Sequence, residues 1–84
     1  MTYKVELNTD IKKQLSDVPK NDVKKILKRI ENFAHTPFPP GYEKLRGMDN
    51  LYRVRQGDYR ILYSVFDDML LVLVVKIGHR REVY

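Results

Sequence analysis

The C-terminal half of the chain consists of short apolar-rich stretches separated by two-residue turns. Residues 43–46 lead into 51–56, which end at Gly57-Asp58; residues 58–66 end at Asp67-Asp68, and a last stretch covers 69–77. Strands joined by so short a turn must pair antiparallel, since a parallel pair needs a crossover of about a dozen residues. The spacing therefore predicts an antiparallel meander, which the remaining residues have to cover or extend.

Alternation within these strands assigns side chains to two faces, because successive residues of a strand point to opposite sides. One set should pack on helices: Tyr52, Val54, Tyr59, Ile61, Tyr63 and Val65. The other set should lie on the opposite side of the sheet, here called the open face: Arg53, Arg55, Arg60, Leu62 and Ser64. The last stretch is apolar on both faces, as in a central strand. Its parity places Lys76 on the side of Val72 and Val74.

The N-terminal half begins with a predicted strand and a short helix. Residues 2–7 alternate between apolar and polar, so Tyr3, Val5 and Leu7 should face inward. A helix over about residues 10–17 follows, with Asn8 or Thr9 as its N-cap, and Pro19 ends it. The chain thus contributes one strand before its helical layer.

A second helix, over about residues 21–35, is the most strongly periodic segment. Its apolar residues recur at i, i+3, i+4 and i+7 and share one helix face: Val23, Ile26, Leu27, Ile30, Phe33 and Ala34. The three prolines of residues 36–41 cannot continue a helix and form a stiff connector. We expect one α+β domain over residues 1–84, of order β-α-α-β-β-β, with two helices packed on one face of an antiparallel sheet.

Composition excludes several kinds of site. The chain has no cysteine, which excludes a disulfide framework, a thiolate zinc site and a cysteine nucleophile. Its two histidines, His35 and His79, are too far apart in sequence to suggest a metal pair. No apolar run approaches the roughly 20 residues that span a bilayer, and the N-terminus has no signal-peptide pattern. We expect a soluble, cytoplasmic protein that needs no membrane, metal or cofactor.

Lysines and arginines are distributed differently along a chain whose net charge is +5. Seven of nine lysines fall within residues 4–28, mostly on the expected helices, where a solvated face is the ordinary explanation. Six of seven arginines fall within residues 46–81, in or beside the expected strands. Guanidinium groups on one face repel each other unless an anion lies between them, and their planar fork suits phosphate. The arginines therefore predict a phosphodiester-binding face that cleaves RNA.

Four segments of this half resemble the RelE toxins of bacterial and archaeal toxin–antitoxin systems. They are Lys44-Leu45-Arg46-Gly47, Tyr52-Arg53-Val54-Arg55, Asp58-Tyr59-Arg60-Ile61-Leu62-Tyr63 and Ile77-Gly78-His79-Arg80-Arg81-Glu82-Val83-Tyr84. The resemblance implies a metal-independent endoribonuclease that depends on the ribosome and cuts mRNA in the A site. It also implies a RelB-like antitoxin as partner, with which the toxin could form a heterotetramer.

The resemblance further assigns roles by position. It implies a catalytic set of Arg53, Arg55, Arg60, Arg80 and Tyr84, and an RNA-binding set of Lys44, Arg46, His79 and Arg81. The best-known members have lysines where this chain has Arg53 and Arg55. Because arginine stays protonated, neither of these two side chains suits the role of general base.

The general base and the function class both remain open at this point. Tyr84 can accept the proton of a ribose 2′-hydroxyl or stack on a nucleobase. His79 titrates near neutral pH, but alternation would send it to the face opposite Arg80. Two other functions compete: a ParE-like protein that inhibits DNA gyrase by binding, and an inactive toxin that acts only as a corepressor with its antitoxin. The arginines and Tyr84 favour RNA cleavage.

Overall fold

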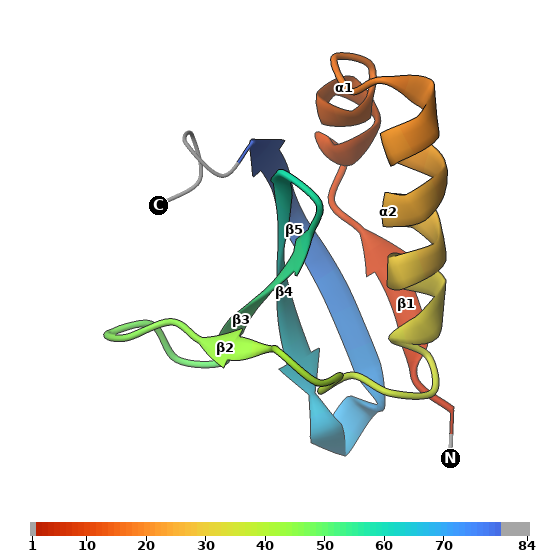
Figure 1. Ribbon diagram of the computed structural model, residues 1–84. Helices are drawn as coiled ribbons and strands as arrows, with labels where there is room; N and C mark the ends of the chain where they lie inside the picture. Colours follow the sequence, from red (N-terminus) through yellow and green to blue (C-terminus); the bar gives the residue numbers. More distant parts are fainter. Residues whose placement is uncertain (1, 80–84) are drawn as a thin grey trace.

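The computed structural model describes residues 2–79, which form a five-stranded sheet with two helices on one side (Figure 1). The elements are β1 (Lys4–Leu7), α1 (Ile11–Leu15), α2 (Lys20–Asn32), β2 (Glu43–Lys44), β3 (Leu51–Gln56), β4 (Tyr59–Phe66), a 3-10 turn (Asp67–Met69) and β5 (Leu71–His79). The strands lie in the order β1-β5-β4-β3-β2, so β5 lies between two strands, as its apolar faces predicted. The α+β class is confirmed. No helix within the described range is long and apolar enough to cross a membrane.

The sheet is mixed, and in this respect the prediction of an antiparallel sheet is wrong. β3, β4 and β5 form the predicted antiparallel meander. β1 instead pairs parallel with β5, starting with Lys4 opposite Leu71. A parallel pair needs a long connection, which the two helices and strands β2 to β4 supply. The hydroxyl of Tyr3 also donates to Asp67 Oδ1 over 2.6 Å, which ties the start of β1 to the turn before β5.

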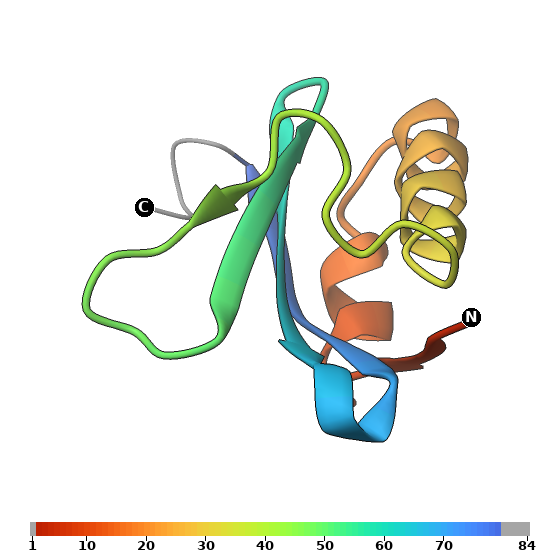
Figure 2. The same ribbon diagram turned by 90° about the horizontal axis from the view of Figure 1, so that it is seen from below.

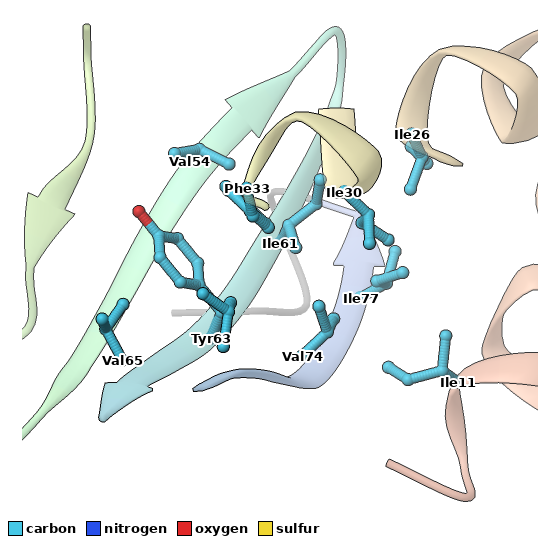
Figure 3. Packing of buried hydrophobic residues seen from close by; sticks show 11 residues of the cluster. Ile11, Ile26, Ile30, Phe33, Val54, Ile61, Tyr63, Val65, Val74 and Ile77 are labelled. Atoms are coloured by element: carbon cyan, nitrogen blue, oxygen red, sulfur yellow. The ribbon is translucent and has the colours of Figure 1, made fainter. Parts of the chain in front are cut away.

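The core lies between α2 and the sheet. Ile26, Ile30 and Phe33 follow one stripe of the helix and are at most 5% exposed. They face buried side chains of the meander, which point toward the helix (Figure 3): Val54, Ile61, Tyr63, Val65, Val74 and Ile77. Val72 belongs to the same cluster. The rings of Phe33 and Tyr63 stack with their centroids 4.2 Å apart, which joins the helix to the sheet. The predicted inner face of β3 and β4 is therefore confirmed.

Three details of the helical half differ from the prediction. Leu27 is 39% exposed, because it lies beside the buried stripe of α2 and not within it. Leu7 is 43% exposed at the end of β1, which is an edge strand. The N-cap of α1 is Asp10, and the side chain of Asn8 instead accepts a hydrogen bond from the Asp10 N–H over 3.2 Å.

A β-bulge interrupts β5 opposite the step from Leu62 to Tyr63. Leu62 pairs with Lys76 but Tyr63 pairs with Val74, so Val75 is an extra residue on β5. The extra residue reverses the alternation of the strand. Lys76 consequently lies on the open face with its partner Leu62, and the prediction that placed it on the helix side is wrong.

The bulge lies where the pairing with β1 ends, at Leu7 opposite Val74. Beyond this point the backbone N–H of Ile77 donates to Gln14 Oε1 of α1 over 2.7 Å. Ile77 takes the core position that a regular strand would give to the preceding lysine, and it is 3% exposed. A side chain of the helical layer thus provides the acceptor that a neighbouring strand would otherwise provide.

Candidate functional site

The pairing of β3 with β4 brings three predicted site residues to the open face. Arg53 and Arg55 flank the buried Val54 in sequence, so they leave β3 on the side away from the core. Arg55 lies directly across from Arg60, and Arg53 lies across from Leu62. Both helices lie on the other side of the sheet (Figure 2). The prediction that these arginines share one face is confirmed.

The bulge in β5 adds a fourth cation to this face. The open-face residues of β3, β4 and β5 form two rows across the sheet: Arg53, Leu62 and Lys76 in one, and Arg55, Arg60 and Gly78 in the next. Lys76 is exposed and has no hydrogen-bond or ion-pair partner within the part of the chain that the structure describes. The open face therefore presents an ammonium group beside its guanidinium groups.

Two guanidinium groups lie directly opposite each other on this face. Like charges directly opposite each other on neighbouring strands, as in Arg55 and Arg60, destabilise a sheet by up to about 1 kcal/mol. Arg53 contacts Glu43 of β2, with 3.3 Å between its Nη2 and the Glu43 Oε2. The Glu43 side chain is 60% exposed, so this pair contributes little to the free energy of unfolding.

Leu62 is a buried apolar residue on the open face, and its two cross-strand neighbours are cations. It is 3% exposed although it points away from the helices, and it is not part of the core cluster on their side. Its cross-strand neighbours are Arg53 and Lys76. Lysine and arginine cover apolar groups with their methylene stems while their charged ends stay in water. Leu62 therefore offers both stems an apolar surface, and the Nε of Arg53 is itself buried.

The other predicted site residues are spread over different places. Lys44 is exposed on β2 opposite Tyr52, which is on the helix side. Arg46 is exposed in the loop of residues 45–50, which projects beyond the open face (Figure 2). His79 pairs with Tyr59, and the two rings meet edge to face with centroids 5.6 Å apart, so His79 lies on the helix side. The predicted Arg80, Arg81 and Tyr84 lie outside the described residues.

The open face can neutralise negative charge, and it offers little else. Guanidinium and ammonium groups donate hydrogen bonds to phosphate oxygens, but an arginine does not take up a proton. Within residues 2–79, no three His, Asp or Glu side chains gather where they could hold a metal ion. The arrangement suits electrostatic stabilisation of a phosphate-centred reaction.

Comparison with known proteins identifies the family. A family model described as the ParE toxin of type II toxin–antitoxin systems, parDE, matches residues 3–84. The chain belongs to the RelE/ParE superfamily of toxins. This RelE/ParE toxin is 33% identical over 87 residues to the toxin RelE1 of Methanocaldococcus jannaschii. The aligned region covers 100% of this chain and 97% of that protein.

Two further relatives link this RelE/ParE toxin to RelE proteins. The mRNA interferase toxin RelE of Escherichia coli K12 is 42% identical over 45 residues, or 49% of this chain and 47% of that protein. The crystal structure of the RelE–RelB complex from Pyrococcus horikoshii OT3 contains a chain with a TM-score of 0.84 and 32% identity, covering 95% of this chain and 97% of that chain. The protein is therefore a toxin of the type II toxin–antitoxin class with a RelE-like fold.

Sequence reasoning missed Lys76 as a residue of this face. The bulge that moves it has no signature in the run Leu73-Val74-Val75, where every residue is apolar and suits either face. One signal was present: Lys76 is the only charged residue in the apolar stretch of residues 69–77. A charge in a central strand is costly if buried, so an exposed position for Lys76 could have been suspected.

Proposed function

We propose that this toxin is a ribosome-dependent endoribonuclease that cleaves mRNA in the ribosomal A site. The observation that carries the proposal is the directly opposed pair Arg55 and Arg60, with Arg53 on the same face. Such a cluster of guanidinium groups on a sheet surface is suited to a phosphodiester whose negative charge increases during reaction. The relative in Escherichia coli that is named an mRNA interferase supports the same class of activity.

The proposed reaction is an internal transfer within the RNA. The ribose 2′-oxygen attacks the adjacent phosphorus, and its proton passes to a base. The bond from phosphorus to the 5′-oxygen of the next nucleotide then breaks, and that oxygen takes up a proton. The products are a 2′,3′-cyclic phosphate and a 5′-hydroxyl. Arg60 and Arg80 stabilise the negative charge on the non-bridging oxygens, and Arg53 and Arg55 bind the flanking backbone.

Tyr84 is the proposed proton acceptor or base-stacking group in this reaction. A phenolate can accept the proton of the 2′-hydroxyl, and guanidinium groups close to a phenol favour that form. The alternative is that its ring stacks on a nucleobase and orients the ribose. Neither role falls to Arg53 or Arg55, because their guanidinium groups remain charged.

The ribosome has a physical role in this proposal. A face of cations without a tuned acid–base pair binds RNA but aligns it poorly for attack. Holding the mRNA in the A site orients the ribose 2′-oxygen for attack on the phosphate. Such orientation lowers the activation barrier by roughly 7–11 kcal/mol. We therefore expect cleavage of translated mRNA and little cleavage of free RNA at physiological salt.

The proposed partner is an antitoxin of the RelB kind, as in the Pyrococcus complex. A segment of it should fold on binding and bring carboxylates to the arginines of the open face. Charge then contributes to affinity, so the complex should dissociate more readily as salt rises.

Primer extension on mRNA from cells that express the toxin tests this function, together with cleavage of mRNA on purified, programmed ribosomes. Cuts within translated codons are expected. Arg60→Ala should lose about 30- to 150-fold in cleavage rate, equivalent to about 2–3 kcal/mol of transition-state stabilisation, while Lys24→Ala on the helix side should cleave normally. Rapid cutting of ribosome-free RNA, or full activity of Arg60→Ala, would contradict the proposal. DNA breaks that depend on gyrase would instead favour ParE-like inhibition.

A further inference from the structure

Lys76 is an exposed cation in an interior strand of the sheet. It has no ion-pair partner within residues 2–79, and its neighbours along β5 are apolar. The bulge at Val75 removes it from the helix side and places it opposite Leu62. Without this bulge, its parity would direct an ammonium group into the core. The bulge therefore both avoids a buried charge and adds a cation to the open face.

Lys76 and Arg60 are neighbours on the open face. Arg60 lies directly opposite Gly78, which is two residues further along β5 than Lys76. Arg60 and Lys76 are thus diagonal neighbours on one face, and diagonal positions lie roughly 7–8 Å apart, within reach of long side chains. Gly78, which lies beside both residues on this face, has no side chain. An oxyanion seated over Gly78 could accept from Arg60 on one side and from Lys76 on the other.

We infer that Lys76 and Arg60, on either side of Gly78, form a subsite for a phosphate of the RNA backbone. The inference rests on the proposed function and adds Lys76 to its substrate-binding residues. The ammonium group contacts a non-bridging phosphate oxygen as a point charge, while the guanidinium group of Arg60 donates in a fork. The stem of Lys76 packs on Leu62 and keeps the ammonium group above the sheet.

Two substitutions separate charge from packing. Lys76→Met keeps an unbranched stem over Leu62 but removes the positive charge, and Lys76→Arg keeps the charge. Lys24→Met makes the same change on the exposed side of α2, behind the sheet. Urea unfolding of all three variants, measured first, shows whether each is folded.

The first measurement is the single-turnover rate of mRNA cleavage on programmed ribosomes with excess toxin. Lys76→Met should cleave about 10- to 100-fold more slowly than the wild type. This loss is somewhat smaller than the loss that follows removal of one oxyanion-hole donor. Lys76→Arg should stay within about threefold of the wild type by the same reasoning, and Lys24→Met should be unchanged. A Lys76→Met variant within about twofold of the wild type would overturn the inference, because the lysine would then serve solubility alone.

The second measurement does not depend on cleavage, so it distinguishes failure of this subsite from failure of the proposed function. A trinucleotide with 2′-O-methyl riboses, which cannot be cut, is titrated into isotope-labelled toxin and followed by amide chemical shifts. Chemical-shift changes at Gly78 and Leu62, together with an affinity for the trinucleotide that is about tenfold lower in Lys76→Met, support the subsite even if the wild type cuts no mRNA. Shifts confined to other surfaces, or equal affinity of the two proteins, would refute it.

Discussion

The hydrogen bond from the Ile77 N–H to Gln14 Oε1 gives the sharpest stability prediction. Gln14→Leu removes the acceptor while keeping a side chain of similar size on α1. Ile77 is 3% exposed, so the N–H is left where water reaches it poorly. An unsatisfied buried donor costs about 1–3 kcal/mol. The variant should therefore unfold with an equilibrium constant about 5- to 150-fold larger than that of the wild type.

The matched control is Gln14→Glu, which places a carboxylate oxygen where the amide oxygen of Gln14 accepts the hydrogen bond. A charged acceptor binds an N–H at least as strongly as an amide oxygen does, so most of the stability should return. Urea titration measures the change in the free energy of unfolding. Amide hydrogen exchange at Ile77 measures the local effect, and its protection should fall in Gln14→Leu but not in Gln14→Glu.

The same substitution has a consequence for cleavage. Ile77 follows the bulge, so a loosened backbone at this point also loosens Lys76 on the open face. The Gln14→Leu toxin should cut mRNA more slowly than the wild type even at temperatures where both are fully folded. If Gln14→Leu has the stability of the wild type and an unchanged exchange rate at the Ile77 amide, then the hydrogen bond to Gln14 does not hold the bulge and the reasoning is wrong.

Three further predictions follow from named residues. Within residues 2–79 the buried hydroxyl of Tyr63 has no hydrogen-bond partner, so Tyr63→Phe should raise the free energy of unfolding at pH 7 by about 1–3 kcal/mol in urea titrations. Burial raises the pKa of Tyr63 above its ordinary value of 10.0, so the unfolded chain loses the phenol proton at a lower pH than the folded protein does. Above pH 10 the free energy of unfolding of the wild type should therefore fall more steeply than that of Tyr63→Phe, by up to about 1.4 kcal/mol per pH unit. Gly57 has φ of +62° in the turn between β3 and β4, and Gly57→Ala should lower the melting temperature through a cost of about 1–2 kcal/mol. Tyr84→Phe should abolish most cleavage on ribosomes if the phenol transfers a proton, and near-normal cleavage would assign it to stacking.

The sequence predicted the arginine face correctly because the hairpin of β3 and β4 is regular. Every pair from Leu51 with Ser64 to Gln56 with Tyr59 follows one register, so simple alternation places each side chain. Alternation failed on β5, where one inserted residue moved Lys76 to the other face. Local sequence does not contain this information, because the bulge lies where a distant strand stops pairing.

The long-range features of the fold were equally out of reach. The parallel pairing of β1 with β5 joins segments at opposite ends of the described chain, and no local pattern encodes it. The periodicity of α2 correctly predicted Ile26, Ile30 and Phe33 as core, but it could not show that Leu27 falls outside the stripe covered by the sheet. Roles for Arg80, Arg81 and Tyr84 stay predictions, since these residues lie outside the described range.

The parallel pairing of β1 with β5 sets the order of events when the protein is synthesised. Residues 4–7 leave the ribosome early, but their partners, residues 71–74, come near the end of the chain. Contacts so distant in sequence form slowly, because the intervening chain must first be ordered. Neither the completed sheet nor the β5 side of the open face can form on a nascent chain that lacks residues 71–79. The open face is therefore complete only after residues 71–79 have been synthesised and have paired with β4 and β1.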